Sequence, residues 1–76
     1  MVLVTNIEKG FKDRDSIHKS TECSYYIVYN KKGEKFLQFD TYGSADREMP
    51  GKTSQSIQFS PEAIEQLKKL LAKEFK

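Results

Sequence analysis

Cys23 and His18, five residues earlier, are the clearest nucleophile and base in this sequence. A thiolate activated by a neighbouring imidazole is a form of covalent catalysis. Nothing in the sequence orients the two groups, because His18 lies in a charged stretch and Cys23 begins a segment that alternates in phase with Tyr25 and Ile27. We therefore interpret them as a buried structural thiol and a solvated histidine.

The acidic residues give no better case for a metal or an active site. Their spacing matches no metal-binding loop motif, and a single cysteine with a single histidine cannot form a cysteine-rich zinc site. The carboxylates concerned are Asp13, Asp15, Asp40, Asp46 and Glu48. The sequence also lacks a P-loop, a glycine-rich dinucleotide turn and a G-x-S-x-G elbow. We expect a protein that is not an enzyme and that binds no metal or cofactor.

Cations and aromatic rings lie within and on both sides of the stretch 35–42 and suggest binding instead of catalysis. Proteins hold single-stranded nucleic acid with cations along the phosphates and with rings on which bases stack. The candidate cations are Lys31, Lys32, Lys35, Arg47 and Lys52, and the candidate rings are Phe36 and Tyr42. The alternatives stay open: ordinary surface lysines, and rings that pack in a second small core against the N-terminal strand or a twin subunit.

The run TSQSIQ at 53–58 is rich in uncharged hydrogen-bonding side chains. On an exposed sheet face, such groups contact phosphates, sugars or base edges. The simpler interpretation is a solvated strand face.

Four strands and one helix must position these residues. β-branched and aromatic runs bounded by turn residues predict strands at about 2–8, 23–30, 35–42 and 53–59. Gly33 supplies a positive φ for a hairpin between the second and third strands. The stretch 43–52 is expected to be an exposed, mobile loop.

Alternation of period two predicts a sheet with one covered and one open face. Leu37 and Phe39 share one face of the third strand, whereas Phe36 and Tyr42 lie on the other. In the fourth strand, Ile57 and Phe59 alternate with Ser56 and Gln58.

A helix over 61–75 follows, with Ser60 as N-cap, Pro61 at its first position and apolar residues at helical spacing. We predict one α+β domain over 1–76: a four-stranded, curved, antiparallel sheet followed by one C-terminal helix packed on one face.

The small size of the chain limits its core. A chain of 76 residues buries only about 60% of its unfolded surface, so association of two copies would supplement its stability. The net charge of +2 excludes a strongly basic tail but leaves room for a local basic face. No run approaches the roughly 20 apolar residues of a membrane span, and one cysteine excludes an internal disulfide. We expect a reduced, cytoplasmic protein without a membrane partner.

The segments KFLQFDTYGSADREMPGK and SIQFSPEAIEQLKKLL, within 35–71, resemble the single-stranded-DNA-binding domain of the transcriptional positive cofactor 4 family and its small bacterial relatives. Tyr42 matches the aromatic residue that ends a strand of that family. The stretches 49–52 (MPGK) and 60–62 (SPE) match its loop exit and helix start. Asp40 or Thr41 stands where the family commonly has arginine, two or three extra residues lie within 53–56, and tryptophan is absent.

The resemblance implies a homodimer whose curved sheets form a groove for single strands. Together with the residues above, it predicts a protein that binds single-stranded DNA, or RNA, with little sequence preference, as an accessory factor of transcription or DNA metabolism. Binding would use Lys31, Lys32, Lys35, Phe36, Tyr42, Arg47 and Lys52. The alternative is a protein-interaction or regulatory module without a nucleic-acid ligand.

Overall fold

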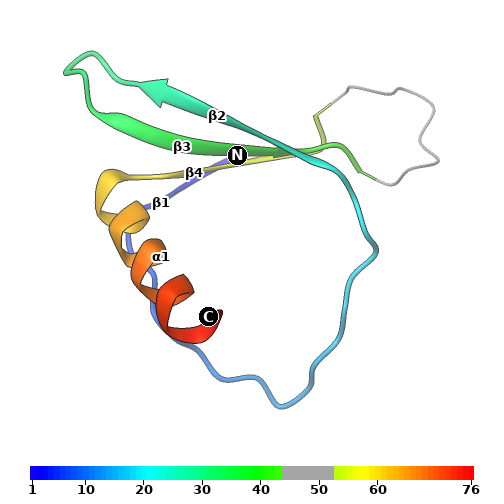
Figure 1. Ribbon diagram of the computed structural model, residues 1–76. Helices are drawn as coiled ribbons and strands as arrows, with labels where there is room; N and C mark the ends of the chain where they lie inside the picture. Colours follow the sequence, from blue (N-terminus) through cyan, green and yellow to red (C-terminus); the bar gives the residue numbers. More distant parts are fainter. Residues whose placement is uncertain (44–52) are drawn as a thin grey trace.

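A computed structural model of the chain describes residues 1–43 and 53–76. In chain order, the elements are β1 (Val2–Val4), β2 (Cys23–Tyr29), β3 (Lys35–Thr41), β4 (Gln55–Phe59) and α1 (Pro61–Glu74). The four strands form one sheet, and α1 lies on one side of it (Figure 1). The α+β class and the order of four strands and one helix are confirmed. The predicted loop at 43–52 falls, apart from Gly43, outside the described residues.

The hairpin between β2 and β3 has the geometry that its turn residues predict. Asn30 N–H donates to the Glu34 carbonyl (3.2 Å), and Gly33 N–H donates to the Asn30 carbonyl (3.1 Å). The Asn30 side chain accepts from the backbone N–H groups of Lys32 (2.9 Å) and Glu34 (3.0 Å). Gly33 adopts a φ of 81°, which a glycine tolerates without strain.

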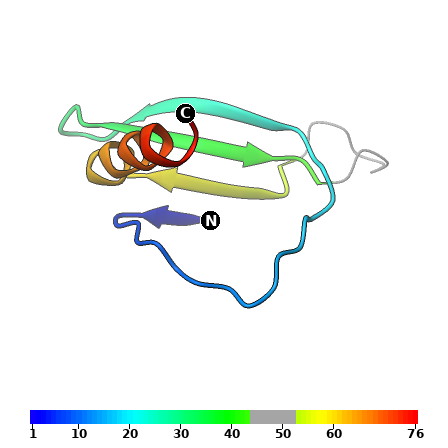
Figure 2. The same cartoon turned by 60° about the horizontal axis from the view of Figure 1, so that its bottom comes forward.

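The sheet is mixed, because its strand order is β1-β4-β3-β2 and β1 runs parallel to β4. The prediction of a wholly antiparallel sheet was therefore wrong for β1, whereas the other two pairings are antiparallel. The parallel direction brings the ends of β1 and β4 together, where Ser60 N–H donates to the Val4 carbonyl (3.0 Å). The chain that follows β1 consequently enters the space beside α1 (Figure 2).

The first strand is also shorter than the predicted range 2–8, and the helix explains why. Ile7 N–H donates to the side-chain oxygen of Gln66 (2.7 Å), and the Gln66 amide donates to Asn6 Oδ1 (2.9 Å). Beyond β1, the chain thus forms hydrogen bonds with a helix side chain instead of with a neighbouring strand. Lys9, whose ammonium lies 3.4 Å from Glu74 Oε2, continues this contact along α1.

The helix begins as its sequence predicts. Ser60 has an extended backbone, and its hydroxyl accepts from Ala63 N–H (3.2 Å) with Pro61 at the first helical position. From this cap, α1 contacts β3 and β4. No helix in the described part of the chain is both long and apolar enough to span a membrane.

The core is small. Ala63 is the only fully buried apolar residue among those described, while Phe39 and Phe59 form an edge-to-face ring contact at 5.8 Å between centroids. Most apolar side chains of β2 are exposed, Tyr25 for example at 68%, whereas Val28 is half-buried. Cys23, at the start of the same strand, is exposed, so its interpretation as a buried thiol was wrong.

Because the Ser60 hydroxyl satisfies a helix N–H in a buried position, we expect the Ser60→Ala variant to lose about 1 kcal/mol of unfolding free energy. Urea denaturation followed by circular dichroism measures this loss. Ser60→Asp is the matched control, because aspartate caps a helix as well as serine does and favours the positive end of the helix dipole. An alanine variant as stable as the parent would show that this cap contributes nothing.

Candidate functional site

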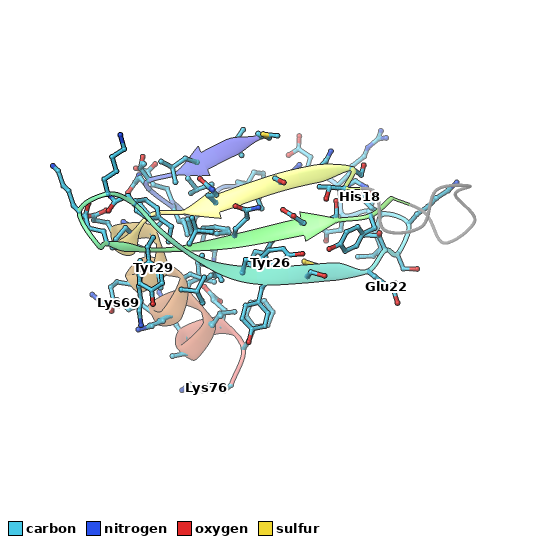
Figure 3. The ribbon with its side chains drawn as sticks, turned by 90° about the horizontal axis from the view of Figure 1, so that it is seen from above. His18, Glu22, Tyr26, Tyr29, Lys69 and Lys76 are labelled. Atoms are coloured by element: carbon cyan, nitrogen blue, oxygen red, sulfur yellow. The ribbon has the colours of Figure 1, made fainter. Side chains whose placement is uncertain are left out.

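The sheet has an open face on the side away from α1 (Figure 3). The strand registers place three cross-strand rows on it, because Gln38 pairs with both Tyr26 and Gln58, Asp40 with Ser24 and Ser56, and Phe36 with Val28. The open face is defined here by Leu3, Ser24, Tyr26, Val28, Phe36, Gln38, Asp40, Ser56 and Gln58. The predicted alternation of both β3 and β4 is confirmed by these registers.

A chain of hydrogen bonds crosses the centre of the open face. The amide of Gln58 donates to Gln38 Oε1 (2.8 Å), and the amide of Gln38 donates to Asp40 Oδ1 (2.9 Å). The Ser56 hydroxyl donates to the same Asp40 oxygen (2.7 Å). These four residues, from two adjacent strands, form what we call the polar strip.

Asp40 sets the direction of the donors in the polar strip. An ionised carboxylate only accepts hydrogen bonds, so Gln38 must present its nitrogen to Asp40 and its oxygen to Gln58. Each of the two amides retains a second N–H, and Gln58 retains its carbonyl oxygen, for a ligand or water. The strip therefore offers both donors and acceptors to whatever lies on the open face.

The same contacts tune Asp40, which is only 9% exposed. The hydrogen bonds from Ser56 and Gln38 lower the pKa of Asp40 below its ordinary value, because they stabilise the ionised form; desolvation opposes them to a smaller extent. Asp40 consequently carries a negative charge at neutral pH in the middle of an otherwise uncharged strip.

Aromatic rings lie beside the polar strip. The hydroxyls of Tyr26 and Tyr42 are 3.3 Å apart, within hydrogen-bond reach. The interaction with Tyr42 raises the pKa of Tyr26. Phe36 lies at the other end of the strip from Tyr42, two residues before Gln38 on β3, and is half-buried. The open face thus combines rings at its sides with amides and a hydroxyl at its centre.

The edge of this face beside β1 is hollowed. A depression of about 330 Å³ lies there, lined by three N-terminal residues and by three residues of the polar strip. Its lining residues are Met1, Val2, Leu3, Gln38, Ser56 and Gln58.

The structure brings together some of the residues predicted for binding and separates others. Phe36 lies on the open face, and Tyr42 reaches Tyr26 of that face.

Lys31 and Lys32 lie exposed in the β2–β3 turn, at one end of the sheet. Lys35 pairs with Tyr29 and alternates onto the face that bears Leu37 and Phe39. Arg47 and Lys52 lie outside the described residues.

Sequence reasoning did not assign Tyr26, Gln38 or Asp40 to the site, and considered Ser56 and Gln58 only within a polar run. The available signal was the matching period of two in 36–42 and 54–58. That period places Gln38 and Asp40 on one face and Ser56 and Gln58 on one face. Only the register between β3 and β4 shows that these two faces are the same.

The arrangement offers binding groups, and the described residues contain no cluster of three or more His, Cys, Asp or Glu side chains suited to a metal ion. Comparisons of the chain with protein-family models, with curated proteins and with solved structures found no match. The resemblance to the positive cofactor 4 family stays a prediction based on the residues quoted above.

The lowered pKa of Asp40 predicts a pH dependence of stability. Its folded pKa lies below the unfolded one, so its contribution is present above the ordinary aspartate pKa and is lost as the pH falls through the lowered folded value. We expect Asp40→Asn to be less stable than the parent at neutral pH, with a difference that narrows in acid. Thermal unfolding from neutral to strongly acidic pH tests this, and a constant difference would contradict it.

Proposed function

We propose that the open face binds single-stranded nucleic acid, most readily DNA, with little sequence preference. The observation that carries this proposal is the placement of the polar strip between Phe36 on one side and the hydroxyl-linked Tyr26 and Tyr42 on the other. Bases stack on aromatic side chains whatever their identity, and amides and hydroxyls reach base edges, sugars and phosphates.

The lysines near the open face suggest that a nucleic-acid single strand would enter this face from the β2–β3 hairpin. Lys31 and Lys32 are exposed in a turn that Asn30 holds with three side-chain hydrogen bonds. Asp40 repels phosphate, so the backbone of the strand would follow the hairpin side while the bases face the polar strip. Contacts with phosphate do not depend on the identity of the bases, so they agree with binding that has little sequence preference.

The proposal includes a homodimer and a role as an accessory factor in transcription or DNA metabolism in the cytoplasm. The second part rests on the resemblance described above. The dimer has support of its own, because a chain with Ala63 as the one fully buried apolar residue in its described part has much to gain from association.

A second candidate function is a protein-interaction module without a nucleic-acid ligand. The exposed apolar side chains on the helix side of β2 and at the end of α1 favour it: Tyr25, Ile27, Tyr29, Leu71 and Phe75. Binding through such a surface is largely indifferent to salt, whereas binding to phosphates weakens steeply as salt is added.

The first test is fluorescence anisotropy with a labelled oligo-dT at several salt concentrations. We expect the logarithm of the affinity to fall with a slope of about −0.7 per neutralised phosphate against the logarithm of salt. Lys31→Glu combined with Lys32→Glu should weaken binding and flatten this slope. A matched reversal at the exposed C-terminal residue, Lys76→Glu, should have little effect. A folded protein that does not bind the oligonucleotide at low salt would defeat the proposal.

The second test separates stacking from other effects of Tyr42. Replacement by alanine should weaken oligonucleotide binding by about 5- to 150-fold, which corresponds to about 1–3 kcal/mol per stacked base. Tyr42→Phe keeps the ring and should bind nearly as well as the parent, although it loses the contact between the Tyr26 and Tyr42 hydroxyls. Equal losses in the two variants would assign the effect to that contact and not to stacking.

A further inference from the structure

Strand β2 forms one edge of the sheet and lacks the features that protect edge strands. In the order β1-β4-β3-β2, its pairing in the described structure is with β3 alone (Figure 2). Its seven residues, CSYYIVY, include no charge, proline or glycine. Proteins usually place lysine, proline or a bulge on such an edge, since an unprotected one is a template for another strand.

The hydrogen bonds of the hairpin determine which backbone groups face this free edge. Asn30 N–H bonds to the Glu34 carbonyl, and hydrogen-bonded pairs then recur at every second residue of an antiparallel ladder. Ser24, Tyr26 and Val28 therefore exchange hydrogen bonds with β3. The backbone N–H and C=O groups of Cys23, Tyr25, Ile27 and Tyr29 point outward.

We propose that two copies of the chain pair through β2, antiparallel, about a two-fold axis at Tyr26. This proposal rests on the homodimer part of the proposed function and is independent of the nucleic-acid ligand. In this register, Tyr25 of one copy exchanges both backbone hydrogen bonds with Ile27 of the second copy, and Cys23 does so with Tyr29. Every outward-facing residue of β2 is thereby paired, and no other antiparallel register about a two-fold axis pairs all of them.

The exposed side chains of β2 favour a second copy as the occupant of this edge. Tyr25, Ile27 and Tyr29 share the helix side of the strand and are 68%, 51% and 58% exposed. Across the two-fold axis, Tyr25 of each copy lies opposite Ile27 of the other, so that an aromatic and a β-branched side chain form cross-strand neighbours, while Tyr29 lies opposite Cys23. The helix side of β2, which α1 leaves uncovered, then becomes part of the interface between the two copies.

The charges at the two ends of β2 are also complementary to those of an antiparallel copy. Glu22 precedes the strand, whereas Lys31 and Lys32 follow it in the turn. Continuing the register by one pair places Glu22 opposite Asn30 of the second copy, next to that copy's Lys31. Because β2 itself carries no charge, this pairing creates no like-charge contact within the strand.

Such a pairing would place both open faces on the same side of one continuous sheet, because the two-fold axis of an antiparallel pair is perpendicular to the sheet. Tyr26 of each copy would meet at the centre, and the two hairpins would lie at opposite ends. A single strand could then cross from one set of hairpin lysines to the other over four neighbouring tyrosines, Tyr26 and Tyr42 of each copy.

Sedimentation equilibrium at high micromolar concentration is the first test. We expect a mass of twice the 8.8 kDa of the chain for the parent and one chain mass for Ile27→Pro. Proline removes an outward N–H and leaves the hydrogen bonds to β3 intact, so the hairpin should survive, as circular dichroism will show. Ile27→Thr keeps the N–H and the β propensity and should remain a dimer.

Disulfide trapping tests the register, and it does not depend on a proline variant that folds. In a Cys23→Ser background, Tyr26→Cys should give a disulfide-linked dimer under mild oxidation. Residues opposite each other in a non-hydrogen-bonded pair have Cα atoms about 4.5 Å apart, within disulfide range. Ser24→Cys alone should not cross-link. It should do so when mixed with Val28→Cys, which lies opposite residue 24 of the second copy.

Two outcomes would overturn the proposal. One is a parent protein that is monomeric at high micromolar concentration, which would leave this edge for a different protein. The other is a dimer that persists in a folded Ile27→Pro variant and does not trap at residue 26, which would place the interface elsewhere. If the parent chain is a dimer and its Tyr26→Cys variant cross-links, failure of the parent dimer itself to bind oligo-dT would refute the proposed function and leave this inference intact.

Discussion

One helix has to cover a sheet of four strands, and the rest of the structure depends on this mismatch. An α-helix with its side chains is about 10–12 Å wide, and neighbouring strands lie about 4.8 Å apart, so one helix shields about two strands. In this chain, α1 contacts the central pair, β3 and β4. The two edge strands, β1 and β2, lie outside this main contact with α1. On one side, the segment after β1 forms hydrogen bonds with Gln66 of α1. On the other side, Tyr25, Ile27 and Tyr29 of β2 stay exposed.

The open face shows how a small sheet can order polar side chains without a helix above them. Asp40 accepts from Gln38 and Ser56, and Gln38 accepts from Gln58, so each of these side chains restricts the rotamers of the next. A ligand that lies on such a strip meets groups that are already oriented, which reduces the entropy lost on binding. With the single-stranded ligand proposed above, the negative charge of Asp40 would favour contacts with donor edges of bases over contacts with phosphate.

Much of the fold follows from local chemistry, whereas the composition of the site does not. Alternation in 35–42, the glycine of the hairpin and the Ser60 cap are short-range signals, and the structure agrees with each of them. The parallel direction of β1 depends on a pairing between the two ends of the chain, and no local pattern encodes it. The polar strip and the position of β2 at an edge depend on strand order and register. Lys35 shows the same limit of sequence analysis. It is adjacent to Phe36 in sequence, but successive residues of a strand point to opposite faces, so Lys35 does not share the open face with Phe36.

The pairing of Val2 with Ile57 has a consequence for how the molecule reaches its native state. The first strand cannot pair until β4, its distant partner in sequence, is in place, and closing so long a loop is entropically slow. The hairpin 23–41 and the helix contain only local contacts and should form early. The hollow beside β1 is therefore the last part of the open face to be built during folding, and the first to be lost when the N-terminal strand detaches.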